Sequence, residues 1–318
     1  MSTYAVDTSS VRTDERLSAF LSEIGASEPV DNFFVRRPAF DALMKKKKTL
    51  DGGRQVIYPI DSGNNPTISD FSDYDVFDTS GMDTVLTVGY PMVNKGGVLQ
   101  LSWEEQRELA GSDHQIFDRL SHIRKNTVNT IMDACATDMF AASAAAKKVT
   151  PLPVTVDATG ATGGLNASTD ADWASTETAS GSFASQGLTD MNTLYNTLIN
   201  NGSMPDLIFT TQSIYEFYEK EVDPDVRYAN AMGIGGRGFK TLEFKQIPLI
   251  HDLKATSGVL YMLDSENLFY VVDSAGNFTI GPFVTPHNQE VSVAKIKLRY
   301  ALVCNRRKSH GKLTGITA

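Results

Sequence analysis

The sequence lacks the long apolar run that a membrane-spanning helix needs. Nowhere in its 318 residues does a stretch approach about 18 consecutive apolar side chains. The N-terminus also lacks the charged-then-apolar layout of a signal peptide. We therefore expect no contact with a membrane, and synthesis in a cytoplasm.

Cysteine is scarce, with only Cys135 and Cys304, each inside an apolar pattern. A disulfide is one alternative, but we favour two buried thiols in a reducing compartment. Three glycosylation sequons at Asn166, Asn201 and Asn277 carry little meaning without secretion.

Positive charge is in deficit. The chain has 29 Lys and Arg against 38 Asp and Glu, a net charge of −9. This balance argues against a protein whose main task is to coat nucleic acid through a basic face. With 41% hydrophobic and 21% charged residues, the composition is that of a globular protein long enough for one large or two packed domains.

Catalytic and metal-binding motifs are also missing. The five histidines are scattered, and no HExxH, CxxC, GxSxG or P-loop pattern occurs. No nucleophile, base and orienting group can be assembled from the pattern. We expect no enzyme activity, no cofactor and no metal.

One glycine-rich segment does match the G-x-G-x-x-G sequence pattern of a dinucleotide-binding turn. It consists of Gly233, Ile234, Gly235, Gly236, Arg237 and Gly238. A dinucleotide turn lies between a strand and a helix, whose N-terminus binds the pyrophosphate. Here the downstream residues 239–250 alternate like a strand. A flexible loop is therefore favoured, and an α/β nucleotide-binding enzyme stays a weaker alternative.

Charge is concentrated in two neighbouring segments. The first is a basic stretch that contains Arg36, Arg37, Lys45, Lys46, Lys47 and Lys48. The second is an acidic stretch that contains Asp70, Asp73, Asp75 and Asp78. The two could pair within one chain, or they could be complementary surfaces between copies.

Hydrophobic periodicity predicts a mixed α+β chain. Helices are expected near 14–24, from about Ser112 through the alanines to about Ala146, from Thr189 to Gly202, and from Ser213. Ser102 with Glu105 and Ser112 with Gln115 have the spacing of capping boxes, and Thr189 and Ser213 are candidate N-terminal caps. Residues 157–187 are expected to form a loop pinned by Trp173 and Phe183. Strands are expected at 54–60, 83–93, 97–102, 205–211, 239–250, 258–263, 268–273, 278–283 and 291–304.

The order of these parts resembles the tailed-phage major capsid proteins of the Hong Kong 97 type, whose fold is shared with encapsulins. The local resemblance lies in PDLIFTTQSIYEFYEK and in GFKTLEFKQIPLIHD followed by GVLYMLDSENLFYVV. It implies an N-terminal arm (1–50), an extended β-hairpin loop (51–102), a peripheral domain with a long spine helix (103–148 plus 276–318) and an axial domain (149–275).

The resemblance implies a coat protein that assembles into pentamers and hexamers of an icosahedral phage head. Its implied partners are itself, scaffolding, portal or decoration proteins, and packaged double-stranded DNA bound without sequence specificity. It implies a location in the virion, after synthesis in a host bacterium. An encapsulin-like shell is the alternative. The basic and acidic stretches become candidate inter-subunit contacts, and the glycine-rich segment becomes an axial loop near a ring centre.

Overall fold

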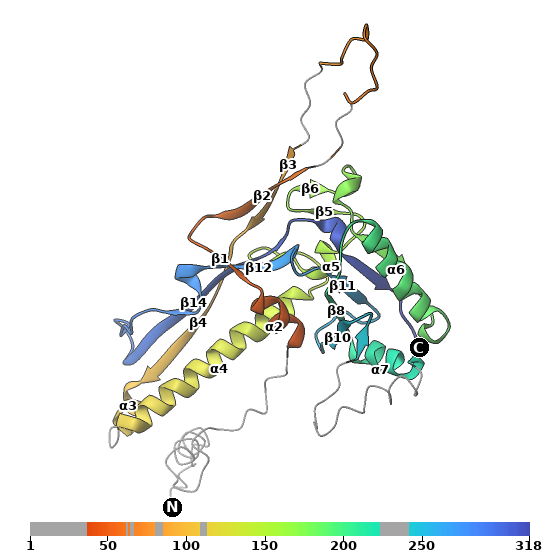
Figure 1. Ribbon diagram of the computed structural model, residues 1–318. Coiled ribbons are helices and arrows are strands. Elements are labelled where there is room, and N and C mark those ends of the chain that lie inside the picture. The colour runs from red at the N-terminus through yellow and green to blue at the C-terminus, as the bar shows by residue number, and fades with distance from the viewer. Residues whose placement is uncertain (1–36, 62, 64–66, 80–84, 109–112, 223–241) are drawn as a thin grey trace, which may run out of the picture. The chain divides into compact units, whose positions relative to one another are not determined.

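The computed structural model describes residues 37–61, 63, 67–79, 85–108, 113–222 and 242–318 (Figure 1). The described residues divide into two compact units, which are considered separately. The helix expected near 14–24, Arg36 and the glycine-rich segment 233–238 lie outside the described residues.

The first unit is built from Lys95–Asp133 and Phe278–Leu298. It includes most of β4 (Val93–Ser102), α3 (Trp103–Glu108), most of α4 (Asp113–Met139), β13 (Thr279–Ile280) and the first half of β14 (Val291–Cys304). Strand β14 pairs with β13 and with β4. A Cβ on Gly97 of β4 would lie 2.5 Å from the Thr127 side chain of α4, so the helix covers that face of the sheet closely.

The start of α3 follows the sequence prediction. The Ser102 hydroxyl accepts a hydrogen bond from the Glu105 amide at 3.1 Å, and the Glu105 carboxylate accepts one from the Ser102 amide at 3.2 Å. This reciprocal pair is a capping box, which satisfies two amides that the helix itself leaves without partners.

Helix α4 is shorter than predicted, because it ends at Met139 and not near Ala146. Met139 and Phe140 are the last buried residues of this run, and residues 142–148 are exposed. Alanine has a high helix propensity, but helices in proteins depend mainly on packing of an apolar face. The chain instead turns back, and Lys148 forms an ion pair with the buried Asp138 at 2.8 Å.

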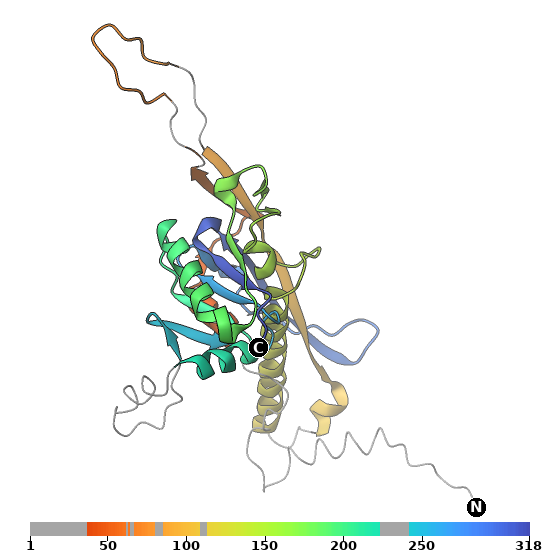
Figure 2. The ribbon, with the colours of Figure 1, turned by 90° about the vertical axis from the view of Figure 1, so that its right-hand side faces the viewer.

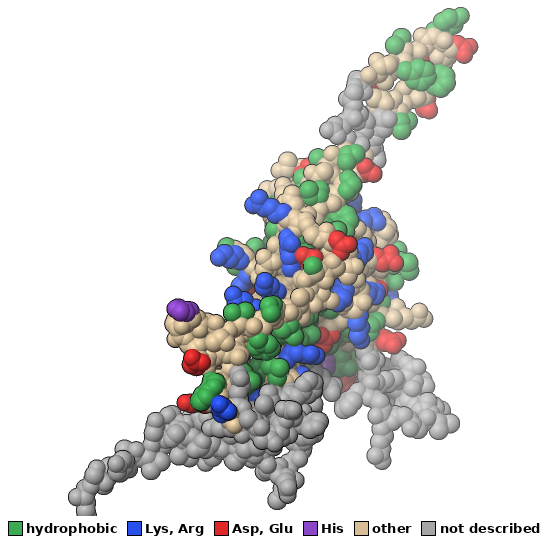
Figure 3. Space-filling view, turned by 90° about the vertical axis from the view of Figure 1, so that its left-hand side faces the viewer, with side chains coloured by type: hydrophobic (Ala, Val, Ile, Leu, Met, Phe, Trp, Pro, Cys, Tyr) green, Lys and Arg blue, Asp and Glu red, His purple; other side chains and the backbone are tan. Residues whose placement is uncertain are grey.

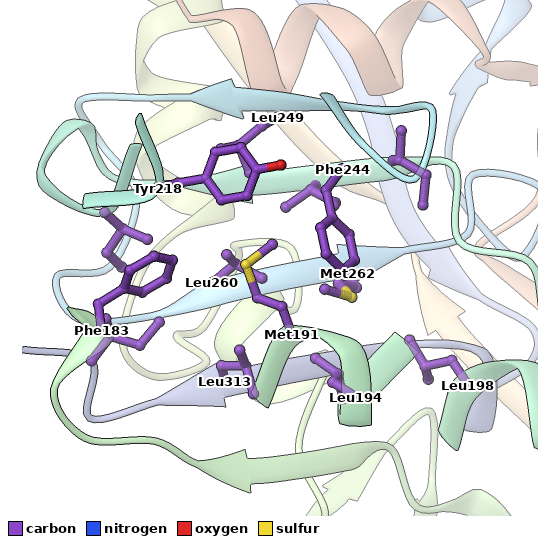
Figure 4. Close-up of a cluster of buried hydrophobic side chains, with 14 residues drawn as sticks. Phe183, Met191, Leu194, Leu198, Tyr218, Phe244, Leu249, Leu260, Met262 and Leu313 are labelled. Atoms are coloured by element: carbon purple, nitrogen blue, oxygen red, sulfur yellow. The ribbon is translucent and has the colours of Figure 1, made fainter. Parts of the chain in front are cut away.

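The second unit contains a six-stranded sheet. Its order is β7 (Thr176–Ala179), β15 (Gly311–Thr314), β11 (Leu260–Leu263), β8 (Leu207–Thr210), β10 (Ile247–His251) and β9 (Glu243–Phe244). Helices α6 (Leu188–Asn200) and α7 (Gln212–Glu221) pack against this sheet, and Figures 1 and 2 both show α6 alongside β15. Between them lies the core of Figure 4, with Phe183, Met191, Leu194, Leu198, Tyr218, Leu249, Leu260, Met262 and Leu313 buried.

Three local predictions in this unit need correction. The strand predicted at 239–250 is a hairpin of β9 and β10, because Lys245 and Gln246 adopt positive φ and reverse the chain. Thr189 and Ser213 were predicted to cap α6 and α7, but both lie inside their helices, which begin at Leu188 and Gln212. The predicted stop at Gly202 is confirmed, since its amide donates to the Ile199 carbonyl at 2.8 Å.

A second group of strands in this unit involves β1 (Lys48–Leu50), which pairs in parallel with β12 (Leu268–Asp273); β12 in turn pairs antiparallel with the second half of β14. Helix α2 (Pro38–Lys45) lies beside them and buries Ala39, Phe40 and Leu43, with the Phe40 ring edge-on to Tyr270 at 5.4 Å. Helix α2, which we expected in the N-terminal arm, is thus packed against this unit, whereas residues 45–50 are exposed.

The remaining elements of the second unit are short, apart from one hairpin. Strands β2 (Gln55–Asp61) and β3 (Val85–Pro91) pair antiparallel over seven residues, as predicted. The segment predicted as a pinned loop buries Trp173 and Phe183. The small elements are α5 (Leu152–Thr155), β5 (Ala161–Thr162), β6 (Leu165–Asn166), η1 (Ala171–Trp173), η2 (Phe183–Gly187), η3 (Ser274–Gly276) and η4 (Arg307–Ser309).

Both cysteines are free and fully buried, which confirms the prediction of two buried thiols. Burial raises the pKa of the Cys304 thiol to about 12, so that thiol stays protonated at neutral pH.

Candidate functional surfaces

The most unusual surface is the hairpin tip, which we define as residues 67–79 beyond β2 and β3. All four predicted aspartates lie there and are exposed: Asp70, Asp73, Asp75 and Asp78. Large apolar side chains alternate with them, namely Ile68, Phe71, Tyr74, Val76 and Phe77. Tyr74 is 97% exposed and Val76 95% exposed. Figure 3 shows both kinds of side chain at the tip.

The tip has local order of its own. The Asp75 carboxylate accepts a hydrogen bond from the Ser72 amide at 2.7 Å, and the Asp75 amide donates back to the Ser72 carbonyl at 2.9 Å. The rings of Phe71 and Phe77 lie 4.8 Å apart. A turn that presents clustered apolar side chains to water is typical of a binding surface, because such exposure has no benefit for an isolated chain.

The basic stretch begins with α2, whose position is set by a distant residue. The Asp252 carboxylate accepts a hydrogen bond from the Ala39 amide at 3.2 Å and so serves as the N-terminal cap of α2. Asp252 follows β10, and its own amide donates to the Thr210 carbonyl of β8 at 2.9 Å. The six-stranded sheet therefore fixes the start of the helix that carries the basic residues.

Three of the predicted basic residues bind within the chain. Lys46 forms an ion pair with Asp206 at 2.5 Å and also contacts the Ser265 hydroxyl. The Lys48 ammonium lies 3.6 Å from the centre of the Phe269 ring, a cation–π contact. Arg37 lies 3.9 Å from Asp41, one helical turn away.

Lys46 also changes the acidity of its partner. Burial alone would raise the pKa of Asp206, but hydrogen bonds from Lys46 and Ser265 hold it below its usual value. Lys45 and Lys47 are exposed at the end of α2 and just beyond it. Of the predicted basic stretch, these two side chains are the ones best placed to meet an outside partner.

A second basic surface, which the sequence analysis did not single out, lies on the first unit. Along β14 the buried residues Ala294, Ile296 and Leu298 alternate with the exposed Lys295 and Lys297. The exposed Val98, which is 53% accessible, lies on the neighbouring strand β4. The signal was the strict alternation within AKIKLRY, which marks a strand with one buried face and one solvated face.

Within the described residues, no group of three or more His, Cys, Asp and Glu side chains is arranged to hold a metal ion. None of the helices in that part of the chain combines the length and apolarity needed to cross a bilayer.

No family model and no curated protein matches this sequence. Solved structures do match. The capsid asymmetric unit of cyanophage A-1(L) matches with a TM-score of 0.70 at 11% identity, covering 93% of this chain and 97% of that one. The capsid of a native GTA particle matches with a TM-score of 0.61 at 12% identity, covering 98% and 100%. The chain has the Hong Kong 97-type capsid fold.

An encapsulin shares this capsid fold. The SrpI encapsulin of Synechococcus elongatus PCC 7942 matches with a TM-score of 0.57 at 11% identity, covering 98% of this chain and 96% of that one. The matches extend over nearly the full length of each chain, so the α+β architecture expected from the sequence is confirmed. At such low identity the likeness establishes the fold, and function has to be argued from the surfaces.

Proposed function

We propose that this chain is a major capsid protein, which assembles through copies of itself into the pentamers and hexamers of an icosahedral phage head. The observation that carries the proposal is the hairpin tip, where five large apolar side chains and four aspartates are exposed on a two-stranded extension. An isolated two-stranded hairpin is marginally stable in water. Contact with a neighbouring copy would bury the tip and stabilise it.

The neighbour's basic side chains are the proposed electrostatic complement of Asp70, Asp73, Asp75 and Asp78. Lys45 and Lys47 are exposed and belong to the stretch anticipated from sequence; Lys295 and Lys297 form the second basic surface. Individual exposed ion pairs contribute only about 0–1 kcal/mol each. Their role is therefore to set the register between copies, while burial of the apolar side chains supplies affinity.

The parts of the chain take their roles from this proposal. Residues 1–50 would include the arm, 51–102 the extended hairpin, 103–148 with 276–318 the peripheral domain, and 149–275 the axial domain. Gly233, Gly235, Gly236, Arg237 and Gly238 would form an axial loop near a ring centre, where little side-chain bulk is tolerated. The protein is proposed to be structural and not enzymatic, and to reside in the virion after synthesis in a bacterial host.

Packaged double-stranded DNA would be enclosed without sequence-specific contacts, which is compatible with the net charge of −9. Scaffolding, portal or decoration proteins would complete the head. The test is electron microscopy of the purified full-length chain, followed by analysis of the particle contents. Closed shells that take up DNA would support the proposal. Closed shells that hold only a protein cargo would support the encapsulin-like alternative.

A further inference from the structure

A buried arginine of the second unit interacts electrostatically with Tyr90 of β3. Arg307 of η4 has no exposed surface. Its guanidinium donates to four backbone carbonyls: Thr155 at 2.8 Å, Gly160 at 3.0 Å, Val154 at 3.1 Å and Thr159 at 3.0 Å. Burying a charge is costly, and four charge-assisted hydrogen bonds are what offset that cost here. One side chain thus fixes residues 154–160.

That fixed segment leads directly into the small β5–β6 hairpin. Its turn is Gly163–Gly164, with φ of +65° and +93°. The Gly163 carbonyl accepts a hydrogen bond from the Gly89 amide of β3 at 2.9 Å. Figures 1 and 2 both show the β5–β6 hairpin beside β3. A Cβ on Gly163 would lie 3.1 Å from Val88 Cβ and 3.3 Å from the Tyr90 hydroxyl, so the contact leaves no room for a side chain.

The contact at Gly89 lies where burial of the large hairpin ends. Val56, Val88 and Tyr90 are buried, whereas Leu86 is half-buried and Val85, at the far end of β3, is 50% exposed. The pair of Tyr58 and Val88, next to Gly89, is the last pair that contains a fully buried side chain, and Tyr58 packs against Phe269. Beyond that pair no side chain of the two strands is fully buried. Their direction therefore depends on what holds β3 at Gly89.

The length of the hairpin makes its direction sensitive to this contact. Fourteen residues separate Gly89 from Asp75, a reach of at most about 46 Å at roughly 3.3 Å per residue. Over such a reach, a tilt of about 10° at the base displaces the far end by roughly 8 Å. A displacement of that size exceeds the range of any hydrogen bond or ion pair at the tip.

We propose that Arg307 is a positioning residue for the hairpin: it holds residues 154–160, these hold the Gly163 turn, and the turn clamps β3 at Gly89. The clamp sets the direction in which the hairpin leaves its own unit. Only its consequence for assembly rests on the proposed function. The direction itself is a property of the single chain and can be measured on unassembled protein.

The decisive experiment compares two neighbouring glycines. Gly163→Ala places a methyl group against Val88 and Tyr90, whereas at Gly164 an added Cβ meets nothing within 4 Å. Both residues have positive φ, so both substitutions impose backbone strain of the same kind. Gly164→Ala is therefore the matched control, which reproduces the strain without disturbing the clamp.

Two readouts apply to the unassembled chain. The first is hydrogen exchange of the Gly89 amide, which we expect to be about tenfold faster in Gly163→Ala, in keeping with loss of one backbone hydrogen bond. The second is the distance distribution between spin labels at Thr79→Cys on the tip and Asn200→Cys in α6. We expect it to shift or broaden by roughly 6 Å in Gly163→Ala, because Thr79 lies ten residues, at most about 33 Å, from Gly89. The native cysteines are buried and will not take up label.

Arginine variants test the contacts between Arg307 and residues 154–160. Arg307→Gln should reproduce both changes. Arg306→Gln is its control, because Arg306 also donates to backbone carbonyls, those of Asn201 and Gly202, but at the end of α6. If Arg307→Gln fails to fold, the comparison of Gly163→Ala with Gly164→Ala alone tests the proposal. The proposal is overturned if Gly163→Ala matches Gly164→Ala in both Gly89 exchange and label distances.

Discussion

The carboxylate of Asp252 caps a helix that begins 213 residues earlier in the chain, at the amide of Ala39, 3.2 Å away. Both residues are buried. The bond joins α2, which carries the basic stretch, to the loop that follows β10. The placement of Lys45 and Lys47 thus depends on a side chain in the loop that follows a strand of the six-stranded sheet.

We predict that Asp252→Ala destabilises the protein by about 1–2 kcal/mol, the usual cost of losing an N-terminal cap. The substitution leaves the Ala39 amide buried without its acceptor. Urea unfolding followed by circular dichroism measures the change. Asp41→Ala is the control in the same helix, since Asp41 is exposed and makes only a 3.9 Å contact with Arg37, so a loss below about 0.5 kcal/mol is expected. Equal losses in the two variants would show that Asp252 is not the cap.

Acid should destabilise the protein through His310. This side chain is buried and its Nδ1 accepts a hydrogen bond from the Asp264 amide at 3.2 Å. Burial lowers the pKa of His310 to about 4, although the nearby Asp264 and Asp206 act in the opposite direction. The unfolded chain binds a proton on this residue below about pH 6.5, and the folded chain does so only near pH 4.

The stabilisation that comes from keeping His310 neutral is therefore fully present above pH 6.5, and this part of the unfolding free energy is lost as the pH falls toward 4. Its maximum is about 3 kcal/mol, at about 1.4 kcal/mol for each pKa unit. His310→Asn, which retains a hydrogen-bond acceptor but does not titrate, should flatten the dependence of unfolding free energy on pH between 4 and 6.5. His287→Asn should leave that dependence unchanged, because His287 is exposed. An unaltered slope in His310→Asn would contradict this assignment.

Charge reversal at the hairpin tip should impair assembly and spare the fold. We expect Asp70, Asp73, Asp75 and Asp78 changed together to Lys to lower particle yield strongly, with the circular dichroism spectrum of the monomer unchanged. The side chains are exposed, so their replacement removes no core packing. A control with the same change in charge replaces the exposed Glu219, Glu221, Glu243 and Glu266 by Lys. Particle yield unaffected by tip reversal would count against the proposed role of the tip.

The identity of the complementary surface can be resolved by charge-swap rescue. Lys45→Glu with Lys47→Glu tests the basic stretch, and Lys295→Glu with Lys297→Glu tests the face of β14. Whichever pair meets the tip should restore particle yield when it is combined with the reversed tip, since opposite charges then face each other again. Lys46 is unsuitable for this test, because it already pairs with Asp206. Rescue by neither pair would exclude both surfaces as the partner.

Elements governed by local rules could be predicted from the sequence. Alternation gave β14 with its bounds at Val291 and Cys304, and the Ser102–Glu105 spacing gave the start of α3. Predictions failed where distant packing overrides local propensity. The alanines after Met139 favour a helix but have no buried face, and the run 239–250 alternates like a strand but turns at Lys245 and Gln246.

The candidate surfaces also divide into features that local sequence sets and features that distant residues set. The four aspartates at the tip were found from charge alone, because they lie close together in the sequence and remain exposed. Local sequence could not reveal that Lys46 is bound by Asp206, or that Arg307 is buried beside an Arg306 that is not. Those differences depend on carbonyls and carboxylates about 100 to 160 residues away.

Electron microscopy of the purified full-length protein tests the central claim most directly. The account predicts closed, hollow particles built from five-fold and six-fold rings, in which the hairpin tip of each copy lies on a neighbour. It would be contradicted by a chain that stays monomeric at high concentration, with the apolar side chains of the tip still exposed to solvent.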